Sequence, residues 1–391
     1  MKRLQVLSLT VFIFAQAYSQ TNLMNVKPWA YWLQTIDIQT IVNDTSFELI
    51  VIDYSADGLD SQKWTVQQID SVKNSGKYAI SYISIGEAED YRYYWQSLWA
   101  TSPPAWLGQE NPNWPGNYAV RFWNQQWQSI VYNYLDTILM QGFDGIYMDL
   151  IDSYYYWSEV NAEQPLADSL MCQFVIDIRD YCDSVRGNNA FVVIPQNGED
   201  VWDQMNVSPV LKAAYFDAIN GIGVEDVFFP GSLDENNQYN PDTYRIGILQ
   251  EYLQNNKQVY AIDYLTDTAK IAQFTNSAII QNYVPYTCTR PLEYLCGGIT
   301  IVPTELEYYG FNEIHISPNP ANEYLRISLQ NNRLDKNITI KLHNSIGQLV
   351  SELYFPDIKD EIIIDLSGYE NGIYFLTVSN NKLLSTFKVI R

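Results

Sequence analysis

Residues 124–150 read NQQWQSIVYNYLDTILMQGFDGIYMDL, and they contain both parts of an α/β repeat. The segment Asn124–Gly142 has the length of a helix and ends at a glycine, which commonly closes helices. The segment Gly145–Leu150 is a short β-rich run with a carboxylate, Asp149, near its end. A helix followed at once by a strand is typical of a parallel sheet, so this stretch predicts an α/β fold.

Similar β-rich runs occur on both sides of this stretch, and most are followed by a helical pattern. The eight predicted strands are Trp29–Leu33, Glu48–Tyr54, Tyr78–Ile85, Gly145–Leu150, Ala190–Ile194, Ala218–Val224, Gln258–Asp263 and Asn282–Cys288. Eight strands alternating with helices predict a (β/α)₈ TIM barrel, which typically takes about 250 residues. An open doubly wound sheet is the alternative, but no Gly-rich phosphate loop follows the first strand.

The start of the chain has the pattern of a secretory signal peptide. Met1-Lys2-Arg3 precedes an apolar run and then small residues, so we expect a signal peptide over residues 1–19 and a mature chain that starts near Gln20. The apolar run has about 11 residues, fewer than the roughly 20 that span a bilayer. No later segment is long and apolar enough, so we expect no transmembrane helix in the mature chain.

The sequence pattern changes at residue 314, where short strands of alternating polar and apolar residues, separated by Asn and Gly turns, begin. Predicted strands are Tyr324–Leu329, Ile338–Asn344, Glu361–Leu366, Gly372–Ser379 and Leu384–Ile390. This pattern predicts a small all-β sandwich after the barrel. We therefore expect a barrel over residues 20–303, a linker over 304–313 and a sandwich over 314–391.

Four sequence fragments occur in order along the sandwich. They are Ser317-Pro318-Asn319-Pro320-Ala321, Asn344-Ser345-Ile346-Gly347-Gln348, Asp365-Leu366-Ser367 with Gly372-Ile373-Tyr374, and Lys388-Val389-Ile390-Arg391. Together they resemble the C-terminal sorting domain of the type IX secretion system of Bacteroidetes. The resemblance implies export by the type IX machinery to the medium or to the outer-membrane surface. An ordinary sandwich accessory module is the alternative.

The negative charge lies on the predicted barrel. Residues 20–313 hold 37 acidic and 13 basic residues, a net charge of −24, whereas residues 314–391 hold eight of each. Such a field disfavours nucleic acid and anionic lipid, and it attracts cations or cationic polymers. The alternative is that the charge keeps a secreted protein in solution.

Cysteines and histidines restrict the chemistry. Cys288 and Cys296 are able to pair in an oxidising compartment, whereas Cys172 and Cys182 lie about 15 Å apart along one predicted helix. Both histidines of the chain fall in the sandwich. The barrel therefore lacks imidazole for a nucleophile system or a metal site, so carboxylates become the default acid, base and nucleophile. We expect no metal and no cofactor.

Acidic residues occur at the ends of six predicted strands, and a basic residue follows the eighth. They are Asp53, Glu87 with Glu89, Asp149 with Asp152, Glu199 with Asp200, Glu225 with Asp226, Asp263, and finally Arg290. The active site of a parallel barrel lies at the C-terminal ends of its strands. Like charges gathered on one rim repel unless they are used, which indicates glycoside hydrolysis or cation binding. No calcium-loop pattern occurs, so we favour hydrolysis.

Aromatic residues follow the third and fourth predicted strands, and they suit a sugar, whose faces are apolar and whose edges are polar. They are Trp95, Trp99, Trp106, Trp114, Trp123, Trp127 and the run Tyr154–Trp157. About half of them are expected to belong to the core. The proline-rich loop Ser102–Asn117 is expected to roof one side of the cleft.

Five segments of the barrel, taken in order, resemble glycoside hydrolase family 114. They are residues 82–92 (YISIGEAEDYR), 142–152 (GFDGIYMDLID), 196–199 (QNGE), 223–226 (GVED), and Pro285-Tyr286 followed by Arg290-Pro291-Leu292. The resemblance implies an endo-α-1,4-polygalactosaminidase-like enzyme that retains configuration, with an Asp after the fourth strand and a Glu from a later strand. By position these are Asp149 as nucleophile and Glu199 as acid, with Glu225 as the alternative acid.

The same segments and strand ends supply the expected substrate-binding residues. They are Asp53, Tyr82, Glu87, Glu89, Arg92, Tyr147, Asp152, Asn197, Asp263 and Arg290. Asp144 precedes its strand, so we expect it at the opposite end of the barrel in a structural role. A retaining pair of carboxyl groups lies about 5 to 5.5 Å apart. The expected substrate is a polysaccharide, with a cationic one containing galactosamine as the hypothesis that the charge favours, and the protein is expected to be a monomer. The alternatives are a non-catalytic glycan-binding barrel and a glycosidase of another linkage specificity.

Overall fold

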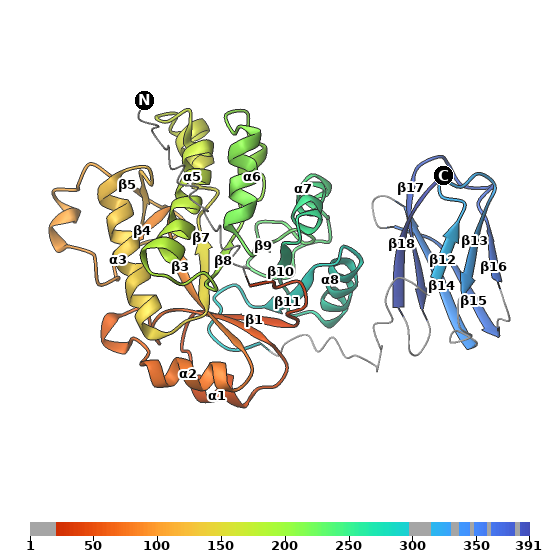
Figure 1. The fold of residues 1–391 in the computed structure, drawn as a ribbon, viewed down its shortest axis with the longest axis horizontal. Helices are drawn as coiled ribbons and strands as arrows, with labels where there is room; N and C mark the ends of the chain where they lie inside the picture. The colour runs from red at the N-terminus through yellow and green to blue at the C-terminus, as the bar shows by residue number, and fades with distance from the viewer. Residues whose placement is uncertain (1–20, 297–313, 330–335, 345–347, 358–360, 380–383) are drawn as a thin grey trace, which may run out of the picture.

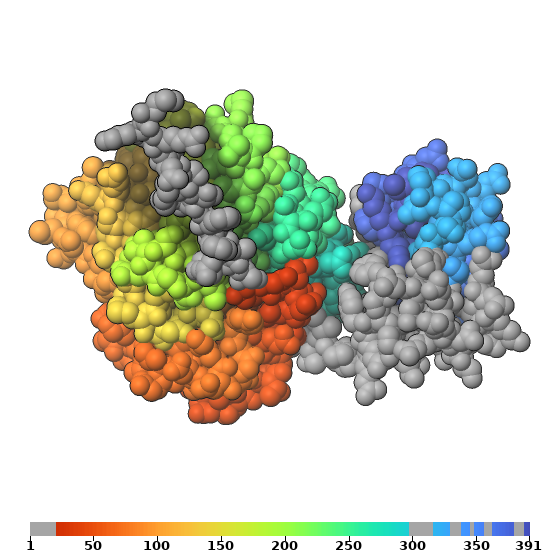
Figure 2. Space-filling view, viewed as in Figure 1, coloured from red at the N-terminus to blue at the C-terminus, as the bar shows by residue number. Residues whose placement is uncertain are grey.

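The computed structural model describes residues 21–296, 314–329, 336–344, 348–357, 361–379 and 384–391. The expected signal peptide (residues 1–19) and linker (residues 304–313) lie outside the described residues. Residues 21–296 form one continuous body in the space-filling view (Figure 2). Among the described residues, no helix has both the length and the apolar character needed to cross a membrane.

Eight parallel strands form a barrel within this body, and helices surround them (Figure 1). The strands are β1 (Trp29–Trp32), β2 (Leu49–Ile52), β3 (Tyr78–Ser84), β7 (Gly145–Asp149), β8 (Val192–Pro195), β9 (Gly221–Glu225), β10 (Gln258–Tyr264) and β11 (Val284–Cys288). They pair in the orders β1-β2-β3-β7-β8 and β11-β10-β9. A bridge from Gln196 to Gly223 joins the two sheets, and Trp29 Nε1 donates to the Val284 carbonyl at 3.0 Å across the other seam. The prediction of a TIM barrel is confirmed.

Eight α-helices lie in this part of the chain. They are α1 (Ile38–Asn43), α2 (Val66–Asn74), α3 (Gln125–Gln141), α4 (Ser153–Tyr155), α5 (Ala167–Asp180), α6 (Pro209–Ala218), α7 (Thr243–Gln254) and α8 (Thr268–Ile280). Helix α3 shows why the local sequence folds in this way. The Asn124 side chain accepts from the Gln126 N–H and caps the first turn, and Gly142 closes the last turn at a φ of 85°. The apolar side of α3, which includes Trp127 and Leu135, is buried against the barrel.

Aromatic side chains fill the interior of the barrel. Trp29 is fully buried, and its ring lies 5.3 to 6.1 Å from the rings of Tyr31, Tyr147, Tyr260 and Tyr286. The centre of the barrel is therefore a packed core and not a pore, as is usual for this fold. Functional side chains have to lie above this layer, at the ends of the strands.

Gly223 makes room for one of these rings. A Cβ atom added at Gly223 would lie 1.8 Å from the Tyr147 hydroxyl oxygen. Neither the strand backbone nor the buried ring can move away to remove this overlap. We therefore expect Gly223→Ala to lower the free energy of unfolding by about 3 kcal/mol. Gly247→Ala is the matched control, because Gly247 lies in helix α7 with nothing within 4 Å of the added Cβ, and we expect a gain of up to about 1 kcal/mol. Urea unfolding measures both, and equal stabilities would contradict the packing argument.

A small antiparallel sheet follows β3, with the order β4-β6-β5. Its strands are β4 (Glu87–Glu89), β5 (Leu107–Glu110) and β6 (Asn117–Val120). The sequence places Glu87 and Glu89 at the end of the third barrel strand, but they form the separate strand β4. Likewise, the stretch Ser102–Asn117, expected to be a loop, contains β5. Pairing with β6, about thirty residues away from β4, creates this sheet.

Two of the four cysteines form a disulfide and the other two are free thiols. Cys288 and Cys296 form a disulfide whose Cα atoms lie 5.4 Å apart. Cys172 and Cys182 are buried free thiols. The disulfide joins the end of β11 to the chain after Arg290, so it closes a short loop at the C-terminal end of the barrel.

The C-terminal part of the chain consists of antiparallel strands. They are β12 (Ile314–Ser317), β13 (Tyr324–Leu329), β14 (Lys336–Asn344), β15 (Leu349–Asp357), β16 (Glu361–Asp365), β17 (Ile373–Ser379) and β18 (Leu384–Ile390). They form two sheets in the orders β12-β13-β16 and β15-β14-β17-β18. Apolar residues such as Leu325, Ile340 and Leu376 form its own core. The predicted all-β module is confirmed, although β12 and β15 are not among the predicted strands.

Candidate active site

Asp149 is the last residue of β7, and two donors hold its carboxylate. The Tyr82 hydroxyl donates to Oδ2 at 2.7 Å, and the Leu150 N–H donates to Oδ1 at 2.8 Å. Burial raises the pKa of Asp149 well above its usual range, and the charge of Glu225 raises it further. Asp149 and Glu225 are therefore close enough to interact, and ionising both at once is costly.

Glu225 is the last residue of β9. Its Oε2 accepts from the Asn197 Nδ2 at 2.8 Å, and its Oε1 accepts from the Tyr264 hydroxyl. The Glu225 N–H donates to Asn197 Oδ1 at 3.0 Å. Asn197 therefore binds both the backbone and the side chain of Glu225, which fixes the carboxyl group beside Asp149.

Glu199 lies in the loop after β8 and has a different environment. Its carboxylate is buried and forms a two-pronged ion pair with Arg245 of helix α7, through Nε to Oε1 and through Nη2 to Oε2 at 3.3 Å. A planar guanidinium in this arrangement favours the ionised carboxylate. Arg245 Nη1 also donates to the main-chain carbonyl of Glu225 at 2.9 Å.

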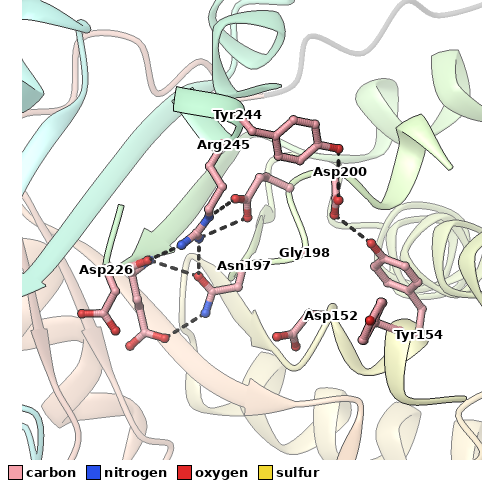
Figure 3. Close-up of a pocket in the computed structure, with 11 residues that line it drawn as sticks. Asp152, Tyr154, Asn197, Gly198, Asp200, Asp226, Tyr244 and Arg245 are labelled. Carbon is pink, nitrogen blue, oxygen red and sulfur yellow. Dashed lines mark hydrogen bonds and ion pairs between the residues drawn. The ribbon is translucent and has the colours of Figure 1, made fainter. Parts of the chain in front are cut away.

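Asn197, Glu199 and Glu225 line a pocket of about 440 Å³ at the ends of the strands (Figure 3), whereas Asp149 is not among its lining residues. Its wall comes mainly from the segments after β7, β8 and β9 and from the start of α7. The lining residues are Asp152, Tyr154, Tyr155, Asn197, Gly198, Glu199, Asp200, Glu225, Asp226, Tyr244 and Arg245. Five of them are carboxylates, whereas Arg245 is the single cation in that lining, so the pocket is acidic.

The remaining pocket carboxylates differ in their partners. Asp200 accepts from the Tyr154 hydroxyl at 2.7 Å and from the Tyr244 hydroxyl at 3.4 Å. Asp226 pairs with Arg290 at 2.9 Å. Asp152 is exposed on the wall of the pocket. Desolvation by the surrounding protein raises its pKa to about 6, and the charges of Glu225 and Glu199 add to this effect.

Five of the ten expected substrate-binding residues lie in or next to this site. Asp152 and Asn197 line the pocket, and Tyr82 binds Asp149. Tyr147 is fully buried below Asp149, and the charges of Glu225 and Asp149 add to burial in raising its pKa. Arg290 reaches the site through Asp226.

Four others lie elsewhere. Arg92 Nη1 pairs with Asp53 Oδ2, and Arg92 Nε pairs with Glu89 Oε2, each at 2.7 Å, and all three side chains are buried. Glu87 accepts from the Asn111 amide at 2.8 Å. None of the four is among the residues that line the pocket. The buried ion cluster ties the end of β2 to the segment after β4, which is a structural arrangement. Asp144, for which we expect a structural role, accepts from the Ala79 N–H at 3.0 Å.

Asp263, the tenth residue, is completely buried near the end of β10. Its oxygens accept from the N–H groups of Phe228 and Phe229 at 3.3 and 3.0 Å. Desolvation, followed by the charge of Asp226, raises its pKa to about 8. Asp263 therefore supports the loop after β9 from within the protein.

The raised pKa of Asp263 makes stability depend on pH. The folded protein keeps the proton that the unfolded chain loses near pH 4, so this contribution to stability falls as pH rises from about 4 to about 8. We expect Asp263→Asn, which cannot ionise, to lose that slope, so that the variant gains stability relative to the wild type between pH 5 and pH 9. Urea unfolding at pH 5, 7 and 9 measures it. A constant difference across this range would contradict the proposed protonation.

The tryptophans expected to contact a sugar pack mainly on the core. Trp106 and Trp127 are buried with ring centroids 5.0 Å apart, and Trp95, Trp99 and Trp123 are partly buried against the core. Trp114 is exposed but does not line the pocket. The aromatic walls of the pocket are instead tyrosines: Tyr154, Tyr155 and Tyr244.

Arg245 and Tyr264 are the main site residues that the strand-end argument missed. Arg245 lies in the first turn of α7, where a positive charge opposes the helix dipole, and this unfavourable position was the available signal. Tyr264 follows Asp263 at the end of β10 and carries no comparable signal. Within the described ranges, no group of three or more His, Cys, Asp or Glu side chains is arranged to hold a metal ion.

Comparison with known families gives two matches. Residues 14–303 match glycoside-hydrolase family GH114, and residues 315–391 match a secretion system C-terminal sorting domain. An uncharacterized protein of Methanocaldococcus jannaschii is 40% identical over 265 residues, which cover 66% of this chain and 74% of that protein. An uncharacterized protein of Thermotoga maritima is 34% identical over 273 residues, which cover 68% and 81%.

Two solved structures share the fold. The glycoside hydrolase domain of PelA from Pseudomonas aeruginosa matches with a TM-score of 0.52 and 15% identity, covering 70% of this chain and 99% of that domain. Ega3 from Aspergillus fumigatus, solved in complex with galactosamine, matches with a TM-score of 0.52 and 16% identity, covering 73% and 99%. At this identity the likeness establishes the fold of the barrel alone.

Proposed function

The chain belongs to glycoside-hydrolase family GH114, and from this premise we propose that it is an exported, endo-acting enzyme that hydrolyses an α-linked amino-sugar polysaccharide with retention of configuration. One observation carries the proposal: Asp149 and Glu225 end β7 and β9 and interact electrostatically beside an acidic pocket. Burial and the charge of Glu225 both make it costly to ionise Asp149, and a retaining glycosidase needs one ionised and one protonated carboxyl group.

Asp149 is the nucleophile in this proposal, because the Tyr82 hydroxyl and the Leu150 N–H both donate to its carboxylate and so oppose the rise in its pKa that burial and Glu225 cause. Its oxygen attacks the anomeric carbon while the glycosidic C–O bond breaks, and Glu225 gives its proton to the departing oxygen. Glu225 then removes a proton from water, which cleaves the glycosyl ester on Asp149 and restores both groups. The sequence position favours Glu199 as the acid, but its ion pair with Arg245 supports Glu225 instead.

An acidic pocket suits a sugar that carries an ammonium group. Asp152, Glu199, Asp200 and Asp226 line the pocket, and the net charge of −24 over residues 20–313 extends the negative field beyond it. The galactosamine bound to Ega3, a protein with the same fold, supports this substrate class. The exposed rings of Tyr155 and Tyr244 offer apolar faces to the sugar.

The sorting domain indicates type IX secretion and a location outside the cell or on its surface. We propose that a signal peptide over residues 1–19 starts this export, and that the module over residues 314–391 engages the type IX machinery. In this scheme, residues 20–303 act as a monomeric catalytic barrel.

Hydrolysis of an α-1,4-linked galactosaminogalactan tests the function. The mature protein is incubated with deacetylated and with fully acetylated polymer at low and high salt, and new reducing ends are counted. We expect faster release from the deacetylated polymer at low salt and a smaller difference at high salt, because salt screens the attraction. The first product observed by NMR should be the α-anomer.

Each other result has a defined meaning. Equal rates on both polymers at both salt concentrations would contradict the cationic substrate and leave the hydrolase intact. A β-anomer as first product would contradict retention. If the protein binds the polymer but releases no more reducing ends than a heat-inactivated control, it is a glycan-binding barrel. Release from a different polysaccharide alone would indicate another linkage specificity.

A further inference from the structure

Arg245 connects helix α7 to the ends of two barrel strands. Its Nε and Nη2 atoms pair with Glu199, its Nη1 donates to the main-chain oxygen of Glu225 at 2.9 Å, and Nη2 also lies 3.4 Å from Asn197 Oδ1. Asp242, the cap of α7, accepts from the Arg245 N–H at 3.1 Å. Figure 3 shows the Arg245 guanidinium near the Asn197 side chain, with dashed lines to its partners. One cation therefore holds the loop after β8 against the end of β9.

These contacts permit one orientation of the Asn197 amide. Oδ1 accepts from the Glu225 N–H at 3.0 Å and faces the Arg245 guanidinium, while Nδ2 donates to Glu225 Oε2 at 2.8 Å. A rotated amide would turn its NH₂ group toward the guanidinium and the Glu225 N–H. All three groups are donors, so no hydrogen bond could form between them. Arg245 and the Glu225 N–H together therefore fix which end of the amide faces the carboxyl group.

The fixed amide restricts where Glu225 can carry a proton. An amide NH₂ group donates and does not accept in this position, so Oε2 has no partner for a hydrogen of its own on that side. Oε1 faces the Tyr264 hydroxyl, which can rotate and either donate or accept. We propose that Arg245 is a positioning residue that, through Asn197, makes Oε1 the oxygen of Glu225 that carries the proton. This inference rests on the acid/base role proposed above for Glu225.

Several other charged or titratable groups face Glu225. They are Asp149 and Tyr147 of β7, Asp152 before α4, Asp226 after β9, Tyr31 of β1, Tyr264 of β10 and Arg290 after β11. None of them is substituted in the Asn197 and Arg245 variants. A change in pH dependence in such variants therefore reports on the amide and the guanidinium.

Asn197→Asp gives the sharpest test, because it replaces the NH₂ donor by a carboxylate oxygen of nearly the same size, which adds a negative charge beside Glu225 and can accept a hydrogen from Oε2. We expect kcat on the deacetylated polymer to fall by roughly 10- to 100-fold with KM changed less than about threefold, and the alkaline limb of the pH–rate profile to move up by about one pH unit.

Arg245→Met should lower kcat at least about tenfold, since the amide is released, and Arg245→Lys should recover much of that loss. Lys212→Met removes a cation that contacts α7 through Glu251 outside the pocket, and we expect an unchanged profile.

A second measurement does not depend on turnover. The side-chain carboxyl carbon of Glu225 is followed by ¹³C NMR during a pH titration of labelled full-length protein, and the resonance is assigned by its loss in Glu225→Gln. We expect its titration midpoint to move upward in Asn197→Asp. Identical midpoints and profiles in the Asn197 and Arg245 variants would overturn the inference, even in an active enzyme. If the wild type hydrolyses no substrate, the proposed function fails, and the titration midpoints still decide whether Asn197 and Arg245 control the protonation of Glu225.

Discussion

Replacing Asp149 by Asn is expected to slow hydrolysis of the polysaccharide by about 10⁴-fold, because the amide cannot form the glycosyl ester. The pocket should remain intact, since Asn keeps an oxygen that accepts from the Tyr82 hydroxyl or the Leu150 N–H. Binding of the polymer should therefore persist. Initial rates of reducing-end release, measured together with polymer retention on an affinity gel, separate these two effects.

Asp57→Asn is the matched control for this experiment. Asp57 is an exposed carboxylate that accepts from the Leu59 N–H at 3.0 Å, so the change removes one negative charge without touching the pocket. We expect its rate to stay within about twofold of the wild type. A comparable rate in Asp149→Asn would exclude the nucleophile role of Asp149, whereas loss of both binding and folding would call for the glutamate variants below.

The barrel could be predicted from the sequence because its strands are local signals. Each strand is a short apolar run, and a run such as Leu49–Ile52 is buried on both faces, so it needs no partner elsewhere to be recognised. Strand β4 lacks this property. It has three residues, two of them glutamates, and its pairing with Asn117–Val120 is a long-range event that no local pattern displays.

The candidate site could be predicted in part for a similar reason. Asp149 and Glu225 end barrel strands, Asn197 follows one, and the fold brings all strand ends to one rim. A carboxylate at that rim is free to react only if no cationic side chain pairs with it. Which cation lies close to it is set by the tertiary structure. Arg245 comes from a helix about 46 residues after Glu199, so the ion pair that sets Glu199 apart from Glu225 leaves no trace in the order of the residues.

The comparison of Glu225→Gln with Glu199→Gln decides which glutamate is the acid. Both variants replace a carboxyl group of the same pocket wall by an amide of nearly the same size, so they are matched in shape. A sugar alcohol is a poor leaving group and needs a proton, whereas fluoride leaves without one. We expect Glu225→Gln to slow cleavage of the polymer by roughly 10²- to 10⁴-fold but to form the glycosyl-enzyme from an α-glycosyl fluoride at nearly the wild-type rate.

The second step of the reaction gives an independent measurement in the same variants. Water needs a base to attack the glycosyl ester on Asp149, but azide does not, so azide should restore turnover of the fluoride in Glu225→Gln and yield an α-glycosyl azide. Glu199→Gln should show neither effect. This variant leaves the Arg245 guanidinium without its counter-ion, so the protein should be less stable. Cleavage of the glycosyl fluoride and cleavage of the polymer should slow to a similar degree. Azide rescue in Glu199→Gln and not in Glu225→Gln would return the acid/base role to Glu199.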